Sequence, residues 1–268
     1  MATHRPSGLG GAAPRWPAHR PGGIESGARE PEAVWSFSLY RGAGEGGGSL
    51  SRRGVAAPSC SRPDAERAAE EAARRARAKI RRYGAANRLN RLGTLTYRGE
   101  GCHDPVRLRR DLGCFFRELR TGLGEGALPY VWVPQWHPGG HGLHAHFAVG
   151  RFVPRGLIDR SWGHGFVHIK LLDGLPVGSG ELGEARLAAR YLAGYAGRDL
   201  ADERRPAGLH RYEVAQGFQP ERILVYGQLA EDVIERASGV MGSGPERVWL
   251  SSSVEGWHGP PACWAQWS

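Results

Sequence analysis

Apolar and polar residues alternate in four short runs in the middle of the chain. Alternation with a period of two is typical of β-strands that bury one face. The four predicted strands are residues 92–97, 130–136, 143–149 and 166–172. The sequence His-Pro-Gly-Gly at residues 137–140 is typical of a turn, so the second and third strands should form a hairpin.

Helical spacing of apolar residues appears between and after these strands. Asp104 and Pro105 suit the N-cap and first position of a helix whose apolar residues, from Leu108 to Leu123, fall on one face. Residues 154–162 suit a short helix, and residues 186–198 a longer one. The order β-α-β-β-α-β plus a last helix predicts an α+β fold: a ferredoxin-like, palm-like antiparallel sheet with helices on one face.

The sequence outside this core, which spans residues 91–200, has a different character. We interpret residues 1–60 as a disordered tail, because they are rich in Gly, Pro and Arg and poor in apolar residues. Residues 61–90 should form a basic helix, because Ala, Glu and Arg continue there without Gly or Pro from Asp64 to Gly84.

Residues 201–268 are expected to form an irregular extension rich in tryptophan. These tryptophans serve either as packing anchors or as platforms on which bases stack. They are Trp249, Trp257, Trp264 and Trp267.

The net charge of +9 is unevenly distributed, because residues 92–268 are neutral and the excess lies before them. A basic segment beside a neutral core suggests a polyanionic partner, most simply nucleic acid. A genome rich in G and C, which inflates arginine, is the alternative. The predicted basic helix could contact DNA phosphates or simply be solvated. Its basic residues are Arg74, Arg75, Arg77, Lys79, Arg81 and Arg82.

Nothing in the sequence indicates a membrane or an oxidising compartment. No apolar run reaches the roughly 18 residues that a transmembrane helix needs, and no secretory signal precedes the core. A cytoplasmic location is therefore expected. The cysteines form no C-x-x-C pair, which predicts reduced thiols without a disulfide framework or thiolate zinc site. They are Cys60, Cys102, Cys114 and Cys263.

His144 and His146 lie two residues apart in the third predicted strand. Side chains at this spacing point to the same face, so the two imidazoles could hold one metal ion. With an oxygen donor, such a pair suits Mg²⁺ or Mn²⁺ and leaves positions open for phosphate oxygens.

Tyr191 and Tyr195 lie four residues apart in the last predicted helix, which places them on one face. Aromatic residues at this spacing are either core residues or a pair of phenols in a site. A tyrosine near a metal can attack phosphorus and form a phosphotyrosine ester. Thr94 and Thr96 share one face of the first strand and either contact a phosphate or pack in the sheet.

Three segments, in order, resemble the HUH endonucleases that initiate rolling-circle replication of plasmids and small phages. They are Leu92–Tyr97, Gln135–Phe147 and Arg190–Asp199, the last of the Y-x-x-x-Y type. The resemblance covers about residues 81–199. It implies a palm-like sheet, a metal held by His144 and His146, and Tyr195 as nucleophile with Tyr191 as the candidate second tyrosine.

The sequence departs from the family pattern at two places. Gln135 stands near where the family usually has an acidic third metal ligand, and His137 or His141 could compensate. The tyrosine motif usually carries lysines, whereas this chain has Gly194 and Arg198. Arg198 keeps a charge for a phosphate; Gly194 does not.

We therefore expect an enzyme that nicks single-stranded DNA at an origin and starts rolling-circle replication through a covalent 5′-phosphotyrosine. Its partners would be DNA, a host helicase and other replication proteins, with no membrane. The alternatives are a related relaxase or transposase, a degenerate DNA-binding protein without catalysis, and a metal protein unrelated to DNA. No P-loop is present, which disfavours a relaxase–helicase fusion.

Overall fold

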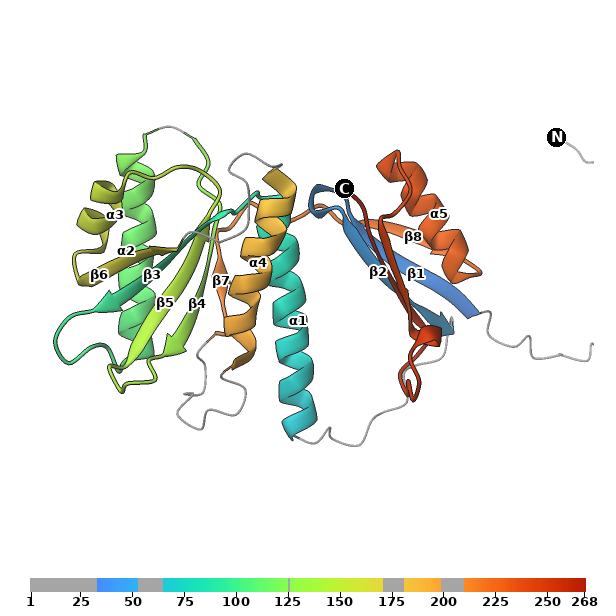
Figure 1. The fold of residues 1–268 in the computed structure, drawn as a ribbon, viewed down its shortest axis with the longest axis horizontal. Coiled ribbons are helices and arrows are strands. Elements are labelled where there is room, and N and C mark those ends of the chain that lie inside the picture. Colours follow the sequence, from blue (N-terminus) through green and yellow to red (C-terminus); the bar gives the residue numbers. More distant parts are fainter. Residues whose placement is uncertain (1–32, 53–64, 125, 171–180, 199–209) are drawn as a thin grey trace, which may run out of the picture.

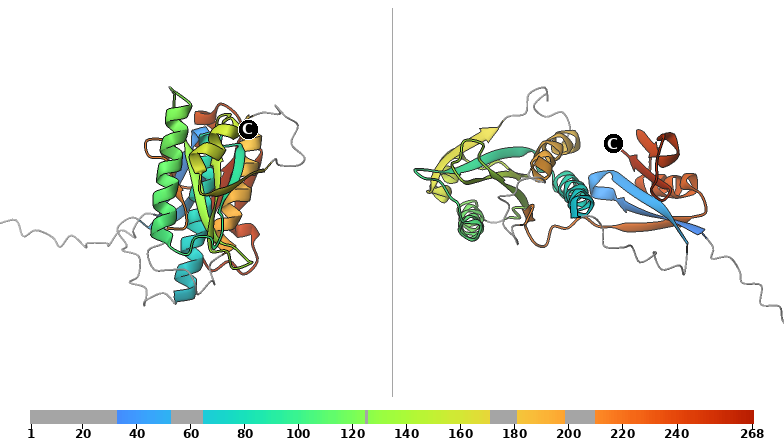
Figure 2. Two further views of the ribbon diagram at one scale, coloured as in Figure 1. Left: turned by 90° about the vertical axis from the view of Figure 1, so that its left-hand side faces the viewer. Right: turned by 90° about the horizontal axis from the view of Figure 1, so that it is seen from below.

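Two antiparallel sheets with two helices between them make up the described part of the computed structural model (Figure 1). It describes residues 33–52, 65–124, 126–170, 181–198 and 210–268. Sheet B contains the predicted core, and sheet A is built from segments on either side of it. In the view from below in Figure 2, the helices α1 (Ala65–Ala86) and α4 (Glu181–Arg198) are seen almost end-on between the sheets.

Sheet B has the strand order β6-β3-β5-β4-β7, with every neighbouring pair antiparallel. Its strands are β3 (Arg91–Tyr97), β4 (Tyr130–Trp136), β5 (Leu143–Val149), β6 (Gly165–Lys170) and β7 (Glu213–Val214). Together with α2 (Pro105–Gly122) and α3 (Arg155–Trp162), the first four follow the predicted β-α-β-β-α-β order. This confirms the ferredoxin-like α+β prediction.

Local signals predicted the first helix and the hairpin correctly. The Asp104 carboxylate accepts a hydrogen bond from the Val106 amide at 2.8 Å, and Pro105 follows at the first helical position. The hairpin pairs Gln135 with His144 and Trp136 with Leu143, as the turn sequence predicted.

Helices cover both faces of sheet B, whereas the sequence predicted helices on one face. On one side α2 and α3 bury their apolar residues against Leu95, Ala145 and Phe147 of the sheet. On the other side α4 packs against β4 and β5, and α1 packs against α4. The prediction was wrong because alternation shows only that one face of a strand is apolar. Here both faces of β5 are buried, so the polar residues of β5 lie under a helix.

Sheet A has the order β8-β1-β2-β10-β9 and joins residues from opposite ends of the chain. Its strands are β1 (Ala33–Tyr40), β2 (Glu45–Arg52), β8 (Ile223–Gly227), β9 (Arg247–Leu250) and β10 (Ala262–Gln266). The interpretation of residues 1–60 as a disordered tail was therefore wrong for residues 33–52. Residues 1–32 and 53–60 lie outside the described residues.

The glycines that suggested disorder are required by the packing of sheet A. A Cβ on Gly46 would lie 2.2 Å from the Phe37 ring, and one on Gly48 would lie 2.4 Å from the Ser36 carbonyl oxygen. The glycines let the Phe37 side chain, which is fully buried, lie across β2. Close approach of a ring to backbone is one of the few uses of glycine inside a strand.

The C-terminal region is also regular, which corrects the expected irregular extension. The helix α5 (Ala230–Met241) covers one face of sheet A, and its residues Ala230, Val233 and Ala237 are buried there. Trp267 is fully buried in the same core. Strand pairing with distant residues 45–49 stabilises β10, and local sequence patterns do not reveal such long-range pairing.

Arginines of the central helices join the two sheets. The Arg186 guanidinium of α4 donates hydrogen bonds to the carbonyls of Ala43, Gly44 and Trp267 in the sheet A region. Burial lowers the pKa of Arg186. Arg82 of α1 forms an ion pair with Glu45 of β2, with Nε and Oε1 3.0 Å apart. Among the described helices, none combines the length and apolar character needed to span a bilayer.

The contact between α1 and α4 gives a stability prediction. Gly84 lies where the helices meet, and a Cβ there would lie 2.7 Å from the Ala189 Cβ. Gly84→Ala should therefore force the helices apart and lower the free energy of unfolding by about 1–3 kcal/mol. Urea denaturation followed by circular dichroism measures this change.

Gly113→Ala is the matched control, because Gly113 lies inside α2 and nothing surrounds its Cβ position within 4 Å. This variant should raise the free energy of unfolding by roughly 0.5–1 kcal/mol through helix propensity. A Gly84→Ala protein that is as stable as the Gly113→Ala protein would contradict the close helix packing.

Candidate functional site

The two histidines of β5 point to the face of sheet B that α4 covers. The intervening residues Leu143, Ala145 and Phe147 pack against α2 and α3 on the opposite face. Alternation along the strand then places His144 and His146 under α4. Both are buried, with 7% and 9% of their surface exposed.

Three donor atoms converge at this position. The Nε2 atoms of His144 and His146 lie 3.1 Å apart, and the Oε1 atom of Gln135 lies 2.8 Å from the His146 Nε2. Gln135 is brought there by register, because it pairs directly with His144 across the hairpin. Adjacent ligands of an octahedral ion with bonds of about 2.1 Å are about 3 Å apart. The donor set and its spacing therefore fit a divalent cation.

Thr94 orients the histidine at the centre of this group. Its hydroxyl oxygen lies 2.9 Å from the His146 Nδ1, and the two residues are paired across β3 and β5. When the hydroxyl accepts from Nδ1–H, the lone pair of Nε2 is free for a metal, as in many metal-binding histidines. Thr96 instead donates to the Phe166 carbonyl at 3.3 Å. The two threonines thus have different contacts.

Burial keeps His144 neutral. The pKa of His144 falls from 6.5 to about 4, first because burial disfavours the imidazolium and second because His137 lies nearby. Its Nδ1 is buried without a hydrogen-bond partner in the described part of the chain. Neutral imidazole is the form that binds metal ions, so the site does not require deprotonation at neutral pH.

The helix α4 brings both tyrosines to the histidines. The Tyr195 ring stacks on the His146 imidazole, with centroids 3.6 Å apart and planes inclined by 14°. The hydroxyl groups of Tyr191 and Tyr195 are hydrogen-bonded to each other. Tyr195 is 8% exposed and Tyr191 is half-buried. The phenols and imidazoles therefore form one cluster, and the tyrosines also pack in the core beneath α4.

Sequence reasoning missed Lys170 at the edge of this cluster. Its Nζ lies 4.6 Å from the centroid of the Tyr191 ring. Lys170 pairs with Leu92, and His168 pairs with Thr94, so both residues of β6 lie on the tyrosine side of the sheet. Alternation along β6 could have revealed this position, and Lys170 is one of only two lysines in the chain.

The other proposed compensating residues lie at the rim. The His137 ring is 5.6 Å from the His144 ring, and its Nδ1 accepts a hydrogen bond from the Gly139 amide at 3.0 Å. His141 is exposed. Within the residues that the structure describes, no group of three His, Cys, Asp or Glu side chains could hold a metal. Gln135 is thus the third donor that lies against the histidines.

The basic residues of α1 make several different contacts. Arg74 and Arg75 form ion pairs with Glu71, and Arg82 pairs with Glu45 while lying 4.4 Å above the Tyr40 ring. Arg77 and Arg81 line hollows between α1 and sheet A, and Lys79 is exposed. The predicted helix is present, but one side of it is buried against α4 and the core, through Ile80 and Tyr83.

The end of α4 differs from the tyrosine motif in a way the structure makes plain. Gly194 is exposed, and nothing lies within 4 Å of its Cβ position. A larger side chain therefore fits there. Arg198 is the last residue of α4, and its side chain lies outside the described part of the structure.

Comparison with known proteins supports a replication protein. Residues 90–200 match the family model described as replication-associated protein ORF2. This range is less than half of the chain and contains β3 to α4, whereas sheet A lies outside it. Searches of curated proteins and of solved structures found no significant match. The match supports a replication initiator of the Rep type, with a role in DNA replication.

Proposed function

We propose that the chain nicks single-stranded DNA at an origin and starts rolling-circle replication through a covalent 5′-phosphotyrosine. One observation carries the proposal: the Tyr195 ring stacks on His146, whose Nε2 lies against His144 and Gln135. A nucleophile and a cation site beside the same imidazole could reach one phosphate. The family match to replication-associated proteins supports the same role.

The chemical step is a transesterification. The Tyr195 hydroxyl oxygen attacks phosphorus, the bond from phosphorus to the 3′ oxygen breaks, and the released 3′ hydroxyl primes synthesis. The free phenol has a pKa of about 10, so it needs activation. Its hydrogen bond to Tyr191 gives the departing proton a path out of the core. Phosphodiester energy is kept in the tyrosyl ester, so a hydroxyl can later rejoin the strand.

Tyr191 is the candidate second nucleophile. It lies one helical turn from Tyr195, and its ring faces the Lys170 ammonium. A nearby cation favours the phenolate form and can also neutralise a phosphate oxygen. Lys170 therefore supplies, from β6, a positive charge of the kind that Gly194 does not provide on α4.

Mg²⁺ or Mn²⁺ would be held by His144, His146 and Gln135 in this proposal. The bound ion supplies Lewis-acid polarisation of the scissile phosphate. The protein residues set its place: Thr94 fixes the His146 ring, and burial keeps His144 neutral. A host helicase is the partner class that would supply further single strand.

A DNA-binding protein without catalysis is the second candidate. It is favoured by Gln135, because an amide oxygen binds a hard cation more weakly than a carboxylate does. Related relaxase or transposase activity uses the same transesterification, and the sequence of the cut site distinguishes it from replication initiation.

Replacing the amide by a carboxylate tests the cation site. Gln135→Glu should tighten Mn²⁺ binding by about tenfold or more, because a charged oxygen replaces a neutral one. Isothermal titration calorimetry measures the affinity. Gln216→Glu is the control, because Gln216 is exposed and the change in charge is the same. Equal Mn²⁺ affinity in both variants would remove Gln135 from the site.

Removing one hydroxyl tests the nucleophile. Tyr195→Phe keeps the ring that stacks on His146 but should abolish covalent protein–DNA adducts with single-stranded oligonucleotides and Mn²⁺. Denaturing gels detect the adducts. Tyr226→Phe, at an exposed tyrosine of β8, should form adducts like the wild type. Adducts that persist in Tyr195→Phe would assign the nucleophile to Tyr191 or another residue.

A further inference from the structure

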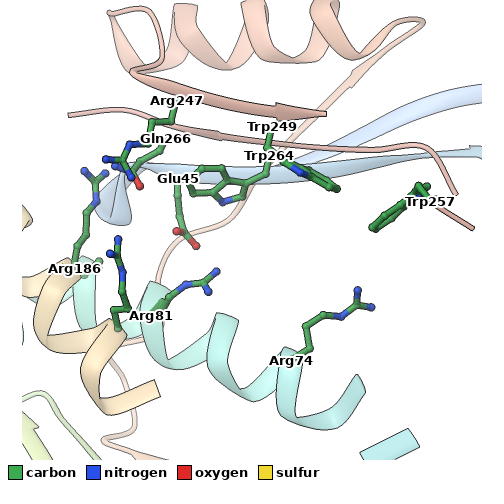
Figure 3. Close-up of a pocket in the computed structure, with 11 residues that line it drawn as sticks. Glu45, Arg74, Arg81, Arg186, Arg247, Trp249, Trp257, Trp264 and Gln266 are labelled. Atoms are coloured by element: carbon green, nitrogen blue, oxygen red, sulfur yellow. The ribbon is translucent and has the colours of Figure 1, made fainter. Parts of the chain in front are cut away.

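A groove outside the nicking site runs between the central helices and sheet A (Figure 3). Its volume is about 580 Å³. One wall is formed by α1 and α4, and the other by β2, β9 and β10. The family match does not include the sheet A wall. The groove is therefore a feature of this chain's additional sheet.

Strand alternation places two tryptophans on the groove side of sheet A. Trp264 of β10 pairs directly with Trp249 of β9, on the face opposite α5. Cys263, Ala265 and Trp267 alternate with Trp264 and are buried in the α5 core instead. Trp249 and Trp264 are thus half-buried lining residues without a role in that core.

Trp257 extends this aromatic surface into solvent. It is 38% exposed, and its ring lies 5.4 Å from the Trp249 ring at an angle of 70°. The Nε1 atom of Trp264 is buried and has no hydrogen-bond partner among the described residues. An aromatic wall with an unsatisfied donor suits a ligand that has flat rings and acceptor atoms.

The helical wall supplies positive charge opposite these rings. Arg81 and Arg190 line the groove from α1 and α4, and Arg247 lines it from β9. None of these three forms an ion pair within the described part of the chain. The acidic lining residue, Glu45, is already paired with Arg82. The groove therefore presents several unneutralised guanidinium groups.

We propose that this groove binds single-stranded DNA, with bases stacked on Trp249 and Trp257 and phosphates against Arg81, Arg190 and Arg247. Aromatic platforms beside a basic wall are the usual means of binding single strands without sequence preference. Bases in a duplex already stack on one another, so the tryptophans have no access to them. The choice of DNA rests on the proposed replication function.

The same helix serves both sites. Tyr191 and Tyr195 of α4 face sheet B, while Arg186 and Arg190 face sheet A. Arg190 is the neighbour of Tyr191 in the chain, so a strand held in the groove would pass close to the tyrosines. At the other end, Glu70 and Glu71 line an adjoining hollow. Their negative charge limits how far a strand would follow α1.

Binding of labelled oligo(dT) to the full chain tests the proposal. The Tyr195→Phe background prevents covalent capture, and fluorescence anisotropy gives the affinity. Trp257→Ala should weaken binding about fivefold or more, and Trp257→Phe should restore most of it, because a ring can still stack. Arg247→Gln should lower the slope of log affinity against log salt by about 0.7, the value for one lost phosphate contact.

Matched controls lie on the far sheet. Phe166→Ala removes an aromatic ring that is 72% exposed on β6, and Arg160→Gln removes an exposed charge from α3. Both should bind oligo(dT) like the parent. Unchanged affinity in Trp257→Ala and Arg247→Gln would overturn the proposal, as would tighter binding of a duplex than of the single strand.

Nicking is measured separately in proteins that retain Tyr195, on an oligonucleotide only a few bases longer than the cut site. Normal cleavage by Trp257→Ala with weakened oligo(dT) binding supports both the groove and the nicking function. Weakened binding in a protein that never cleaves leaves the groove supported and rejects nicking. Normal cleavage with unchanged oligo(dT) binding rejects the groove alone.

Discussion

The parallel stack of the Tyr195 ring on the His146 imidazole is the contact on which the candidate site depends. It fixes the position of α4 over β5 and thereby places a phenol beside the imidazole of the donor cluster. Aromatic pairs contribute about 0.5–1.5 kcal/mol beyond the burial of their area. The stack also explains how Tyr195 can be a core residue and a candidate nucleophile at once: its ring packs, and its hydroxyl bonds to Tyr191.

A second constraint is that α4 lies in a layer shared by two sheets. Arg186 ties α4 to the carbonyls of sheet A, while the tyrosines face sheet B. Gly84 and Ala189 let α1 lie close beside it. A strand of DNA bound along the sheet A side would therefore be held by the same rigid helix that carries the nucleophile. Such positioning by rigid elements is what a transesterification needs.

The sequence allowed the chemistry of sheet B to be predicted because its signals are local. Alternation in residues 143–149 placed His144 and His146 on one face, and the four-residue spacing paired Tyr191 with Tyr195. The role of Thr94 beside His146 was left open, because only the strand register brings the two together. Lys170 reaches Tyr191 for the same reason, and no local pattern links residues on β6 and α4.

Sheet A escaped prediction because its pairing is long-range and its glycines resemble a flexible tail. Gly46 and Gly48 accommodate Phe37, a contact visible only after β1 and β2 are paired. The tryptophans show the same limit. Both interpretations of them apply, since Trp267 is a packing anchor and Trp249 lines an open groove. Strand alternation separates the two roles once β10 is known.

The central claim is that a cation bound by the histidines lies beside the Tyr195 phenol. Fluorine NMR of protein labelled with 3-fluorotyrosine tests this most directly, with Tyr→Phe variants to assign each resonance. Saturation with paramagnetic Mn²⁺ should broaden the resonances of Tyr195 and Tyr191 beyond detection and leave that of Tyr226, on sheet A, sharp. A Tyr195 resonance that stays sharp while Mn²⁺ is bound would contradict the account.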